Sequence, residues 1–301
     1  MKLQNFLPTG HFWDNALSVL NARKRLGYFP NPRKPRSFNE HILAQKWDFR
    51  GDLALASRVT DKAEVKKWLA EIGMEHLIVP TLGVFKNTWD IEAFHFEGEL
   101  IAKSTHGSGE ALIRTAQNGR AFSMEDLEIF RSWFSEDYYK RSREPNYKGL
   151  SKRIIVEPLL RDETGNPPKD FKFFCADGEP FAVQVDHGRY THHTRQLYDT
   201  SWQLLPYSMC YERNPVPMRK PALLGQALEA ARQLSKGFGF VRVDFYFMPK
   251  GLKLGEMTFF PGNGAERFSP AEGDAQLGRQ IRKVGFTADQ TAGMQKMSGK
   301  Q

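Results

Sequence analysis

The sequence predicts a mixed α/β or α+β protein, and two observations support that fold class. Segments with apolar residues every three to four positions, typical of helices, alternate along the chain with short β-branched and aromatic runs, typical of strands. Several of these runs lie close enough in sequence to pair as hairpins, which argues against a purely parallel, doubly wound sheet. With 301 residues, 40% of them hydrophobic, the chain can form one large domain or two ordinary ones.

Helical patterns come first along the chain. Residues 1–60 mix basic residues, prolines and short helical pieces, and we expect them to form an N-terminal helical cap. A helix is predicted over 60–73, where Val65, Leu69 and Ile72 keep a period of 3.6 residues.

A second helix is predicted from Ser123, which forms a capping box with Asp126. A third is predicted over 221–237, where it ends at a glycine. Strand patterns occur over 153–160, 171–175, 180–187, 240–247 and 252–259. Because helices and strands interleave while the strands form neighbouring pairs, the fold is expected to hold mainly antiparallel sheets.

Composition and charge restrict the class of function. Two cysteines, Cys175 and Cys210, lack the spacing of a metal site and cannot form a disulfide framework, so we expect buried thiols in a reducing cytoplasm. No apolar run approaches the roughly 18 residues of a membrane span. The net charge of +8 favours an anionic partner: a nucleotide, an acidic polymer or, at the membrane periphery, a lipid headgroup. Nucleic acid is a minor alternative, since no RNP-like motif, zinc-finger spacing or basic helix is evident.

The last two predicted strands carry a pair of carboxylates. Strand alternation puts Arg242 and Asp244 on one face of 240–247, and a five-residue loop to the next strand would place Asp244 opposite Glu256. Oxygen ligands of this kind suit Mg²⁺ bound together with a nucleotide, and the Thr258 hydroxyl could contribute. The alternative is structural, with Arg242 neutralising the two carboxylates on a solvated face.

A glycine-rich loop follows an apolar strand that ends near Lys103. Glycines let backbone N–H groups approach phosphate, and a lysine supplies a positive charge. The loop residues are His106, Gly107, Ser108 and Gly109. The run is neither a Walker loop nor G-x-G-x-x-G, so a simple hairpin turn, with a polar loop histidine, is the alternative.

In their order, these motifs resemble the ATP-grasp ligases. More closely, the segments SFNEHILAQKWDF, KSTHGSGEALI, DFKFFCADGEPFAVQVDH and GEMTFFPGNG resemble the TupA-like ATP-grasp proteins, which are associated with teichuronopeptide and other surface-polysaccharide biosynthesis. The resemblance covers most of residues 30 to 280. It implies an ATP-grasp fold with a reduced, largely helical N-terminal region. It also implies an N-terminal grasp part with a glycine-rich lid at 61–152, a catalytic part at 153–285 and a tail at 286–301.

The resemblance also implies ATP and magnesium sites. Lys62 and Lys103 would bind the ATP phosphates, and the loop from His106 to Gly109 would cover them. The nucleoside would be held by Glu157, Pro158, Leu159, Leu160 and Asp170, with Lys172 reaching phosphate or remaining a surface lysine. Two Mg²⁺ ions would be held by Asp244 and Glu256, with Thr258 at a position where the better-known ligases have Asn. The catalytic groups would be Arg242, Lys103 and Ser108.

The implied reaction is amide formation between a carboxylate and an amine through an acyl phosphate. An amino acid or amino alcohol would be joined to a uronic acid of a surface polysaccharide or its precursor. Candidate substrate residues are Asp186, Arg189, His193 and Arg195, for which surface ion pairs are the alternative. Rival functions are phosphotransfer on the same scaffold and polyanion binding without catalysis.

Overall fold

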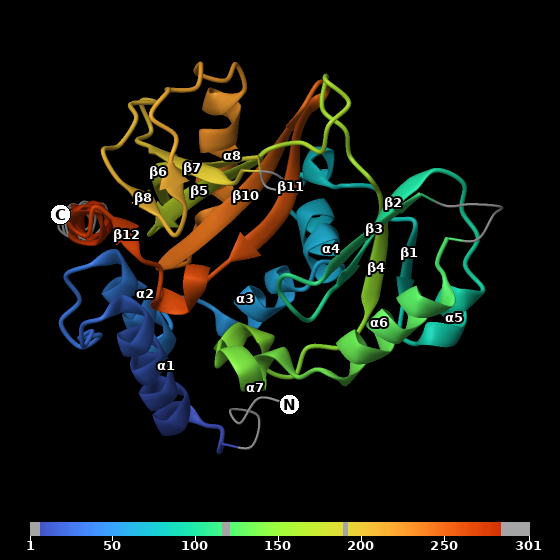
Figure 1. The fold of residues 1–301 in the computed structure, drawn as a ribbon, viewed down its shortest axis with the longest axis horizontal. Helices are drawn as coiled ribbons and strands as arrows, with labels where there is room; N and C mark the ends of the chain where they lie inside the picture. The colour runs from blue at the N-terminus through green and yellow to red at the C-terminus, as the bar shows by residue number, and fades with distance from the viewer. Residues whose placement is uncertain (1–6, 116–120, 189–191, 284–301) are drawn as a thin grey trace, which may run out of the picture. The chain divides into compact units, whose positions relative to one another are not determined.

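The computed structural model describes residues 7–115, 121–188 and 192–283, which form two compact units (Figure 1). Within these ranges, the first unit is built from residues 53–168 and 248–256. The second is built from 8–52, 169–247 and 257–283. Each unit therefore joins segments that lie far apart in the sequence. The predicted tail, 286–301, lies outside the described residues.

The first unit contains a four-stranded antiparallel sheet in the order β1-β4-β2-β3 (Figure 1). Its strands are β1 (Gly83–Phe85), β2 (Glu99–Ser104), β3 (Ala111–Thr115) and β4 (Ile154–Pro158). Strand alternation turns Leu100 and Ala102 of β2 into a core that also contains Phe130 of α6 (Met124–Ser135) and Ile91 of α5 (Thr88–Glu92). Burial of these apolar side chains holds the sheet against α5 and α6.

Helix α6 begins where the sequence predicts. The hydroxyl of Ser123 accepts a hydrogen bond from the backbone N–H of Asp126, and the Asp126 carboxylate accepts one from the N–H of Ser123. The predicted capping box is thus confirmed, and it satisfies two N–H groups that a helix start leaves unpaired.

The helix predicted over 60–73 is interrupted at its start. Helix α3 (Leu53–Thr60) ends there, and α4 (Glu64–Glu71) begins only after a turn. Asp61 forms that turn, because its Oδ1 accepts the N–H groups of residues 63 and 64 at 2.8 and 3.1 Å. The other helical segments of this unit are short: η2 (Glu75–Leu77), α7 (Tyr138–Ser142) and η3 (Pro145–Tyr147).

A six-stranded sheet runs in the order β11-β10-β5-β6-β7-β9. Its strands are β5 (Asp170–Ala176), β6 (Glu179–His187), β7 (Thr194–Tyr198), β9 (Glu212–Arg213), β10 (Phe240–Met248) and β11 (Gly251–Thr258). The pairs β10–β5, β5–β6 and β6–β7 are antiparallel, and β7–β9 is parallel. The predicted α+β class with mainly antiparallel sheets is therefore confirmed.

The second unit packs helices on strands through aromatic side chains. Helix α8 (Leu224–Ser235) lies on β5 and β6. Phe38 at the start of α2 (Phe38–Trp47) contacts Phe174 and Phe240 edge to face, with ring centroids 5.5 and 5.8 Å apart. Further elements are α1 (His11–Leu26), β8 (Ser208–Met209), η4 (Pro261–Gly264) and β12 (Phe268–Ser269), and residues 272–283 are helical. No helix among residues 7–115, 121–188 and 192–283 has the length and apolar character to cross a membrane.

The connection between β10 and β11 corrects one expectation. The strands reach Met248 and Gly251, so only Pro249 and Lys250 separate them. The five-residue loop inferred from the sequence is wrong, because the pairing continues closer to the turn than the proline suggested. The facing of Asp244 and Glu256, which was deduced from that loop, remains a prediction.

Candidate functional site

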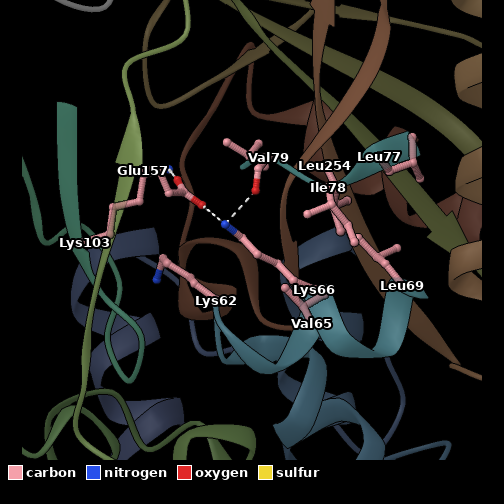
Figure 2. A pocket seen from close by; sticks show the side chains of 11 residues that line it. Lys62, Val65, Lys66, Leu69, Leu77, Ile78, Val79, Lys103, Glu157 and Leu254 are labelled. Carbon is pink, nitrogen blue, oxygen red and sulfur yellow. Dashed lines mark hydrogen bonds and ion pairs between the residues drawn. The ribbon is translucent and has the colours of Figure 1, made fainter. Parts of the chain in front are cut away.

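A pocket in the first unit combines cationic and apolar side chains (Figure 2). Its polar lining comes from Lys62, Lys66, Lys103 and Glu157. Its apolar lining comes from Val65, Leu69, Leu77, Ile78, Val79 and Leu254, with Gly255 beside them. An apolar wall beside clustered ammonium groups matches the chemistry of a nucleotide, whose base is apolar on its faces and whose phosphates are anionic.

Glu157 on β4 lies between two lysines of this pocket. Its Oε1 is 2.5 Å from the Nζ of Lys66 and its Oε2 is 2.7 Å from the Nζ of Lys103. Only 5% of the Glu157 side chain is exposed. Burial alone would raise the pKa of this carboxyl group, but Lys103 and Lys66 outweigh burial and hold the pKa below its ordinary value. Glu157 is therefore an ionised, buried carboxylate.

Lys66 is a pocket residue that the sequence reasoning missed. It lies on α4, and besides Glu157 it donates to the carbonyl oxygen of Val79 at 2.8 Å and to Oγ1 of Thr81 at 2.7 Å. Burial lowers its pKa, and the carboxylate of Glu157 opposes that shift. A usable signal was present, since Lys66 follows Lys62 by four residues and that spacing puts two side chains on one side of a helical segment.

The glycine-rich loop after β2 is fixed at its base. The Nε2 of His106 lies 3.0 Å from the carbonyl oxygen of Trp133, and its Nδ1 accepts the N–H of Arg153 at 3.3 Å. Because Nδ1 accepts a hydrogen bond, Nε2 must carry the ring proton and donate it in a hydrogen bond to the carbonyl oxygen of Trp133. Burial lowers the pKa of the imidazole, which favours this neutral form. His106 is thus a buried anchor of the loop.

Two further contacts hold the loop itself. The Nζ of Lys62 donates to the carbonyl oxygen of Gly107 at 2.7 Å. Ser108 shares a hydrogen bond with the hydroxyl of Tyr138 on α7. Burial lowers the pKa of Lys62, and the carboxylate of Glu256 counteracts that shift. The first unit therefore brings Lys62, the loop and Glu256 into one electrostatic environment.

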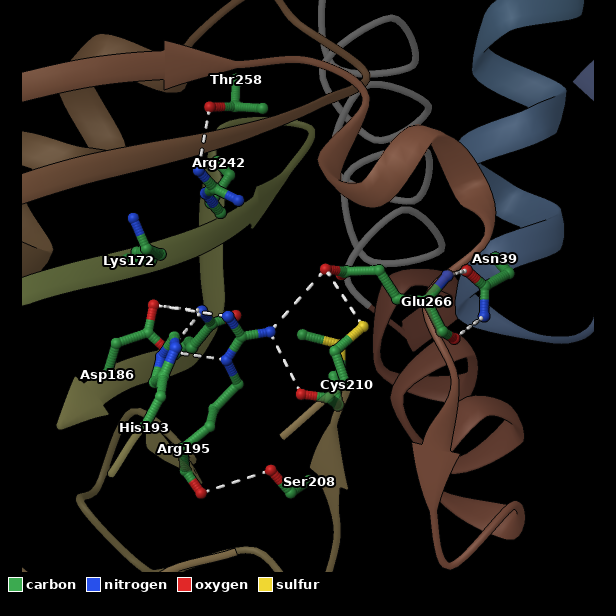
Figure 3. A network of polar contacts seen from close by, with 12 residues as sticks. Asn39, Lys172, Asp186, His193, Arg195, Ser208, Cys210, Arg242, Thr258 and Glu266 are labelled. Atoms are coloured by element: carbon green, nitrogen blue, oxygen red, sulfur yellow. Dashed lines mark hydrogen bonds and ion pairs between the residues drawn. The ribbon is translucent and has the colours of Figure 1, made fainter. Parts of the chain in front are cut away.

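The second unit buries a group of charges around Asp244 of β10 (Figure 3 shows Lys172, Arg242 and Thr258). The Asp244 carboxylate accepts Nε and Nη2 of Arg242, each at 2.7 Å, and the Nζ of Lys172 at 2.7 Å. Nη2 of Arg242 also donates to Oγ1 of Thr258 at 3.1 Å. Oδ1 of Asp170 lies 3.8 Å from the Nζ of Lys172. Strand register explains the group, because Lys172 of β5 pairs directly with Asp244.

These contacts decide two of the alternatives that the sequence left open. Lys172 is 6% exposed, so it is not a surface lysine. Asp244 is 1% exposed, so Arg242 pairs with it inside the protein and not on a solvated face.

A second group of charges in this unit surrounds Asp186 of β6 (Figure 3). Its Oδ1 is 2.6 Å from Nε of Arg195 and 3.4 Å from Nε2 of His193. Burial alone would raise the pKa of Asp186, but Arg195 outweighs it and lowers the pKa to about 2. Tyr211 stacks on His193 with ring centroids 3.6 Å apart, and the guanidinium of Arg195 lies 4.8 Å from its centroid.

Glu266 extends this group and was not predicted. Its Oε1 lies 3.7 Å from Nη1 of Arg195 and 3.8 Å from Sγ of Cys210. Its Oε2 and the Nε2 of His193 are buried atoms without a hydrogen-bond partner. Nothing in the residue pattern around position 266 distinguished this glutamate from a surface residue. The predicted substrate residue Arg189 lies outside the described residues.

No set of three or more His, Cys, Asp or Glu side chains in the described parts of the chain could hold a metal ion without other ligands. A magnesium ion that binds together with phosphate needs only one or two protein carboxylates. Asp244, Glu256 and Thr258 supply oxygen donors only, the ligand type that Mg²⁺ prefers. Their chemistry therefore fits the ion.

Comparison with known proteins gives a family match over most of the chain. The sequence model of the family described as TupA-like ATP-grasp matches residues 46–282. This match confirms the resemblance that the motifs indicated. No curated protein matches the chain.

Several solved structures are similar in fold at low sequence identity. The D-alanine–D-alanine ligase from Bacillus anthracis is 15% identical, with a TM-score of 0.48, over 80% of this chain and 72% of that one. The D-alanine–D-alanine ligase from Helicobacter pylori is 11% identical, with a TM-score of 0.45, over 82% and 66%. The ATP-grasp ligase PsnB, in complex with a minimal precursor, is 12% identical, with a TM-score of 0.40, over 76% and 61%. The family assignment rests on the sequence model alone.

Proposed function

Because this chain belongs to the TupA-like ATP-grasp family, we propose that it is an ATP-dependent ligase that joins an amine to the carboxylate of an acidic sugar. The amine would be an amino acid or amino alcohol, and the acid a uronic acid of a surface polysaccharide or its precursor. Family membership makes the chain an ATP-grasp enzyme, and the choice of substrates is our proposal. ATP as a substrate favours a cytoplasmic location.

The single observation that supports this function best is the lysine pocket of the first unit. Lys66 forms an ion pair with one oxygen of Glu157. The ammonium group of Lys103 can therefore pair with a phosphate without leaving the carboxylate unpaired. The apolar residues Val65, Leu69 and Leu254 line the same pocket beside these charges. Lys62 lies beside the glycine-rich loop, where a second phosphate contact is needed.

The proposed reaction has two balanced steps. The substrate carboxylate attacks the γ-phosphorus of ATP, and the bond from that phosphorus to the bridging oxygen breaks to give an acyl phosphate and ADP. The amine nitrogen then attacks the acyl carbon, phosphate leaves, and the nitrogen gives up a proton to form the amide. Phosphoryl transfer requires positioning and charge neutralisation more than a covalent nucleophile. Lys62, Lys103 and Arg242 are the cations assigned to that task, and Ser108 in the loop would help to exclude water.

We assign magnesium to the carboxylates of Asp244 and Glu256, with Thr258 as a hydroxyl donor directly or through water. When bound, the ion would neutralise phosphate charge. Lys172 and Arg242 already hydrogen-bond to Asp244, so this carboxylate is fixed in position in the second unit.

The group around Asp186 is the proposed site for substrate recognition. It contains two carboxylates, one bidentate arginine and an imidazole, which can bind both an ammonium group and a carboxylate. Oε2 of Glu266 is a buried polar atom without a hydrogen bond, and Nε2 of His193 has only the 3.4 Å contact with Asp186, so a substrate can supply hydrogen bonds to both atoms. His193 would accept the proton that the amine loses. The excess of 43 basic over 35 acidic residues is in keeping with an acidic polymer as acceptor.

The first experiment measures thermal unfolding with ATP, with and without Mg²⁺. A ligand that binds the native state raises the apparent unfolding temperature. We expect a magnesium-dependent increase in the wild type and none in the double variant Asp244→Asn, Glu256→Gln. An equal increase in both proteins would refute the magnesium assignment.

The second experiment measures ADP release with uronic acid and amine supplied separately and together. A ligase releases ADP at steady state only when both are present, with one amide formed for each ADP. Release that needs the acid but no amine, with a stable phosphorylated product, would identify a phosphotransferase instead. Polymer binding that does not weaken with salt would exclude the acidic acceptor.

A further inference from the structure

Helix α1 presents large apolar side chains to solvent. Phe12 is 73% exposed, Trp13 45% and Leu20 53%. Leu20 lies eight positions after Phe12 and seven after Trp13, so the three side chains share one side of the helix. Clustered apolar side chains on a protein surface mark a site of contact with another molecule.

The opposite side of α1 is packed against the protein through small and polar residues. Asn15, Ser18, Val19 and Ala22 are the buried positions. The hydroxyl of Ser18 donates to the carbonyl of residue 14 at 2.6 Å and accepts the Nζ of Lys46 at 2.7 Å. The usual pattern of a surface helix, with apolar residues inside and polar residues outside, is thus partly inverted, so burial within the second unit does not explain Phe12, Trp13 and Leu20.

Cations accompany these side chains. Arg23 and Lys24 lie eleven residues after Phe12 and Trp13, which returns them to the same side of the helix. The guanidinium of Arg23 lies over the ring of Phe29, 5.5 Å from its centroid, and Phe29 is 63% exposed. The exposed cations from position 23 to 36 are Arg23, Lys24, Arg25, Arg33, Lys34 and Arg36, and the sequence holds no acidic residue in that interval.

We propose that the α1 outer face, defined as Phe12, Trp13, Leu20, Arg23, Lys24 and Phe29, docks on an anionic phospholipid surface. Aromatic and leucine side chains on one side of a helix, next to Lys and Arg, are the pattern of a helix lying in a membrane interface. Trp is favoured at that depth, and each basic residue near anionic lipid adds attraction.

Charge and side-chain chemistry favour a membrane over two other occupants. A soluble polyanion would use Arg23 and Lys24 but would leave Phe12, Trp13 and Leu20 in water. A second copy of the chain in a two-fold dimer would bring the cations of both copies into one interface, and like charges repel. A bilayer surface satisfies both kinds of side chain. This inference does not depend on the proposed ligase reaction.

The test is sedimentation of the full chain with vesicles of phosphatidylcholine, with and without phosphatidylserine. We expect binding only to the anionic vesicles and loss of that binding in high salt. Arg23→Gln with Lys24→Gln should weaken binding about 25-fold, since each cation contributes about a fivefold factor. Phe12→Ala with Leu20→Ala should weaken it at unchanged charge.

Matched controls isolate the face. Lys236→Gln with Lys250→Gln removes two exposed cations elsewhere, and Trp89→Ala removes an exposed tryptophan of the first unit. Both should bind as the wild type does. Brominated lipid should quench less fluorescence in Trp13→Phe than in the wild type, because Trp13 enters the bilayer. Equal loss of vesicle binding in the control variants and the face variants would overturn the proposal. So would concentration-dependent dimerisation that the Phe12 and Leu20 changes abolish while vesicle binding persists.

Discussion

The Nζ of Lys66 on helix α4 lies 2.5 Å from Oε1 of Glu157 on strand β4. This contact joins a helix to the strand that carries the predicted nucleotide carboxylate. It also leaves Oε2 of Glu157 to a different lysine, Lys103, at 2.7 Å. One carboxylate therefore orders two cations, and the distance between those cations is fixed before any phosphate arrives.

Glu157→Gln should destabilise the protein by about 3 kcal/mol, because it leaves two partly buried ammonium groups beside an uncharged amide. Urea unfolding measures this free energy. Glu71→Gln is the matched control, since Glu71 pairs with Arg58 at the surface and its side chain is 55% exposed. The control should change stability by about 0.5 kcal/mol or less. Equal effects of the two changes would mean that the pocket carboxylate contributes no more than a surface ion pair.

Lys66→Gln should weaken MgATP binding about tenfold although Lys66 is not assigned to a phosphate. Without Lys66, Glu157 has only Lys103 as a cationic partner and holds it more tightly, so transfer of Lys103 to phosphate becomes less favourable. Titration with a fluorescent ATP analogue gives the dissociation constant. Lys67→Gln, one residue further along α4 and exposed, is the control and should bind as the wild type does. Tighter binding in Lys66→Gln would reverse the assigned role of this lysine.

The sequence predicted the elements well where local signals were complete. The capping box of Ser123 and Asp126 located the start of α6, and strand alternation located β10 around Val241 and Val243. It failed where two local signals competed. The apolar period of Val65 and Leu69 predicted one helix from residue 60. In the structure one helix ends at Thr60, and the side chain of Asp61 forms a turn before the next helix begins.

The candidate site was predicted in part. Lys62, Lys103 and Glu157 line the pocket. They could be named from the sequence because each belongs to a recognisable motif. Lys66 and Glu266 were missed because their partners are far away in the chain: Lys66 meets Glu157, and Glu266 meets Arg195. Such contacts follow from the packing of separate elements, and no pattern within a short window of sequence encodes them.

The charges around Asp186 predict a pH dependence of stability. The pKa of this group is lowered to about 2 in the folded state, so its stabilising contribution is present above the ordinary carboxyl pKa of about 4 and is lost as the pH falls through 2. Asp186→Asn should therefore be less stable than the wild type by about 2 kcal/mol at pH 6, and this difference should shrink steadily towards pH 3. Urea unfolding across that range tests the prediction, which a difference independent of pH would contradict.

Arg242→Lys should lower kcat about a hundredfold while changing the affinity for MgATP little. Lysine keeps the positive charge but cannot donate to Asp244 and Thr258 in the two-pronged geometry of Arg242. Steady-state ADP release with both substrates gives kcat, and nucleotide titration gives the affinity. Thr258→Val removes only the hydroxyl and should cost kcat less. If Arg242→Lys retains full activity, the charge alone suffices and the geometry around Asp244 has no catalytic consequence.

Gly107→Ala should raise the KM for MgATP several-fold by displacing the glycine-rich loop. A Cβ at position 107 would lie 2.6 Å from Oε2 of Glu110 and 2.9 Å from Oγ of Ser104, closer than any such contact allows. The carbonyl of residue 107, which accepts Lys62 at 2.7 Å, would move with the backbone. Glu110→Ala removes the nearer obstacle, so adding it to Gly107→Ala should restore part of the lost affinity, a non-additive result that a double-mutant cycle detects. Strictly additive effects of the two changes on KM would show that the clash with Glu110 does not set the position of the loop.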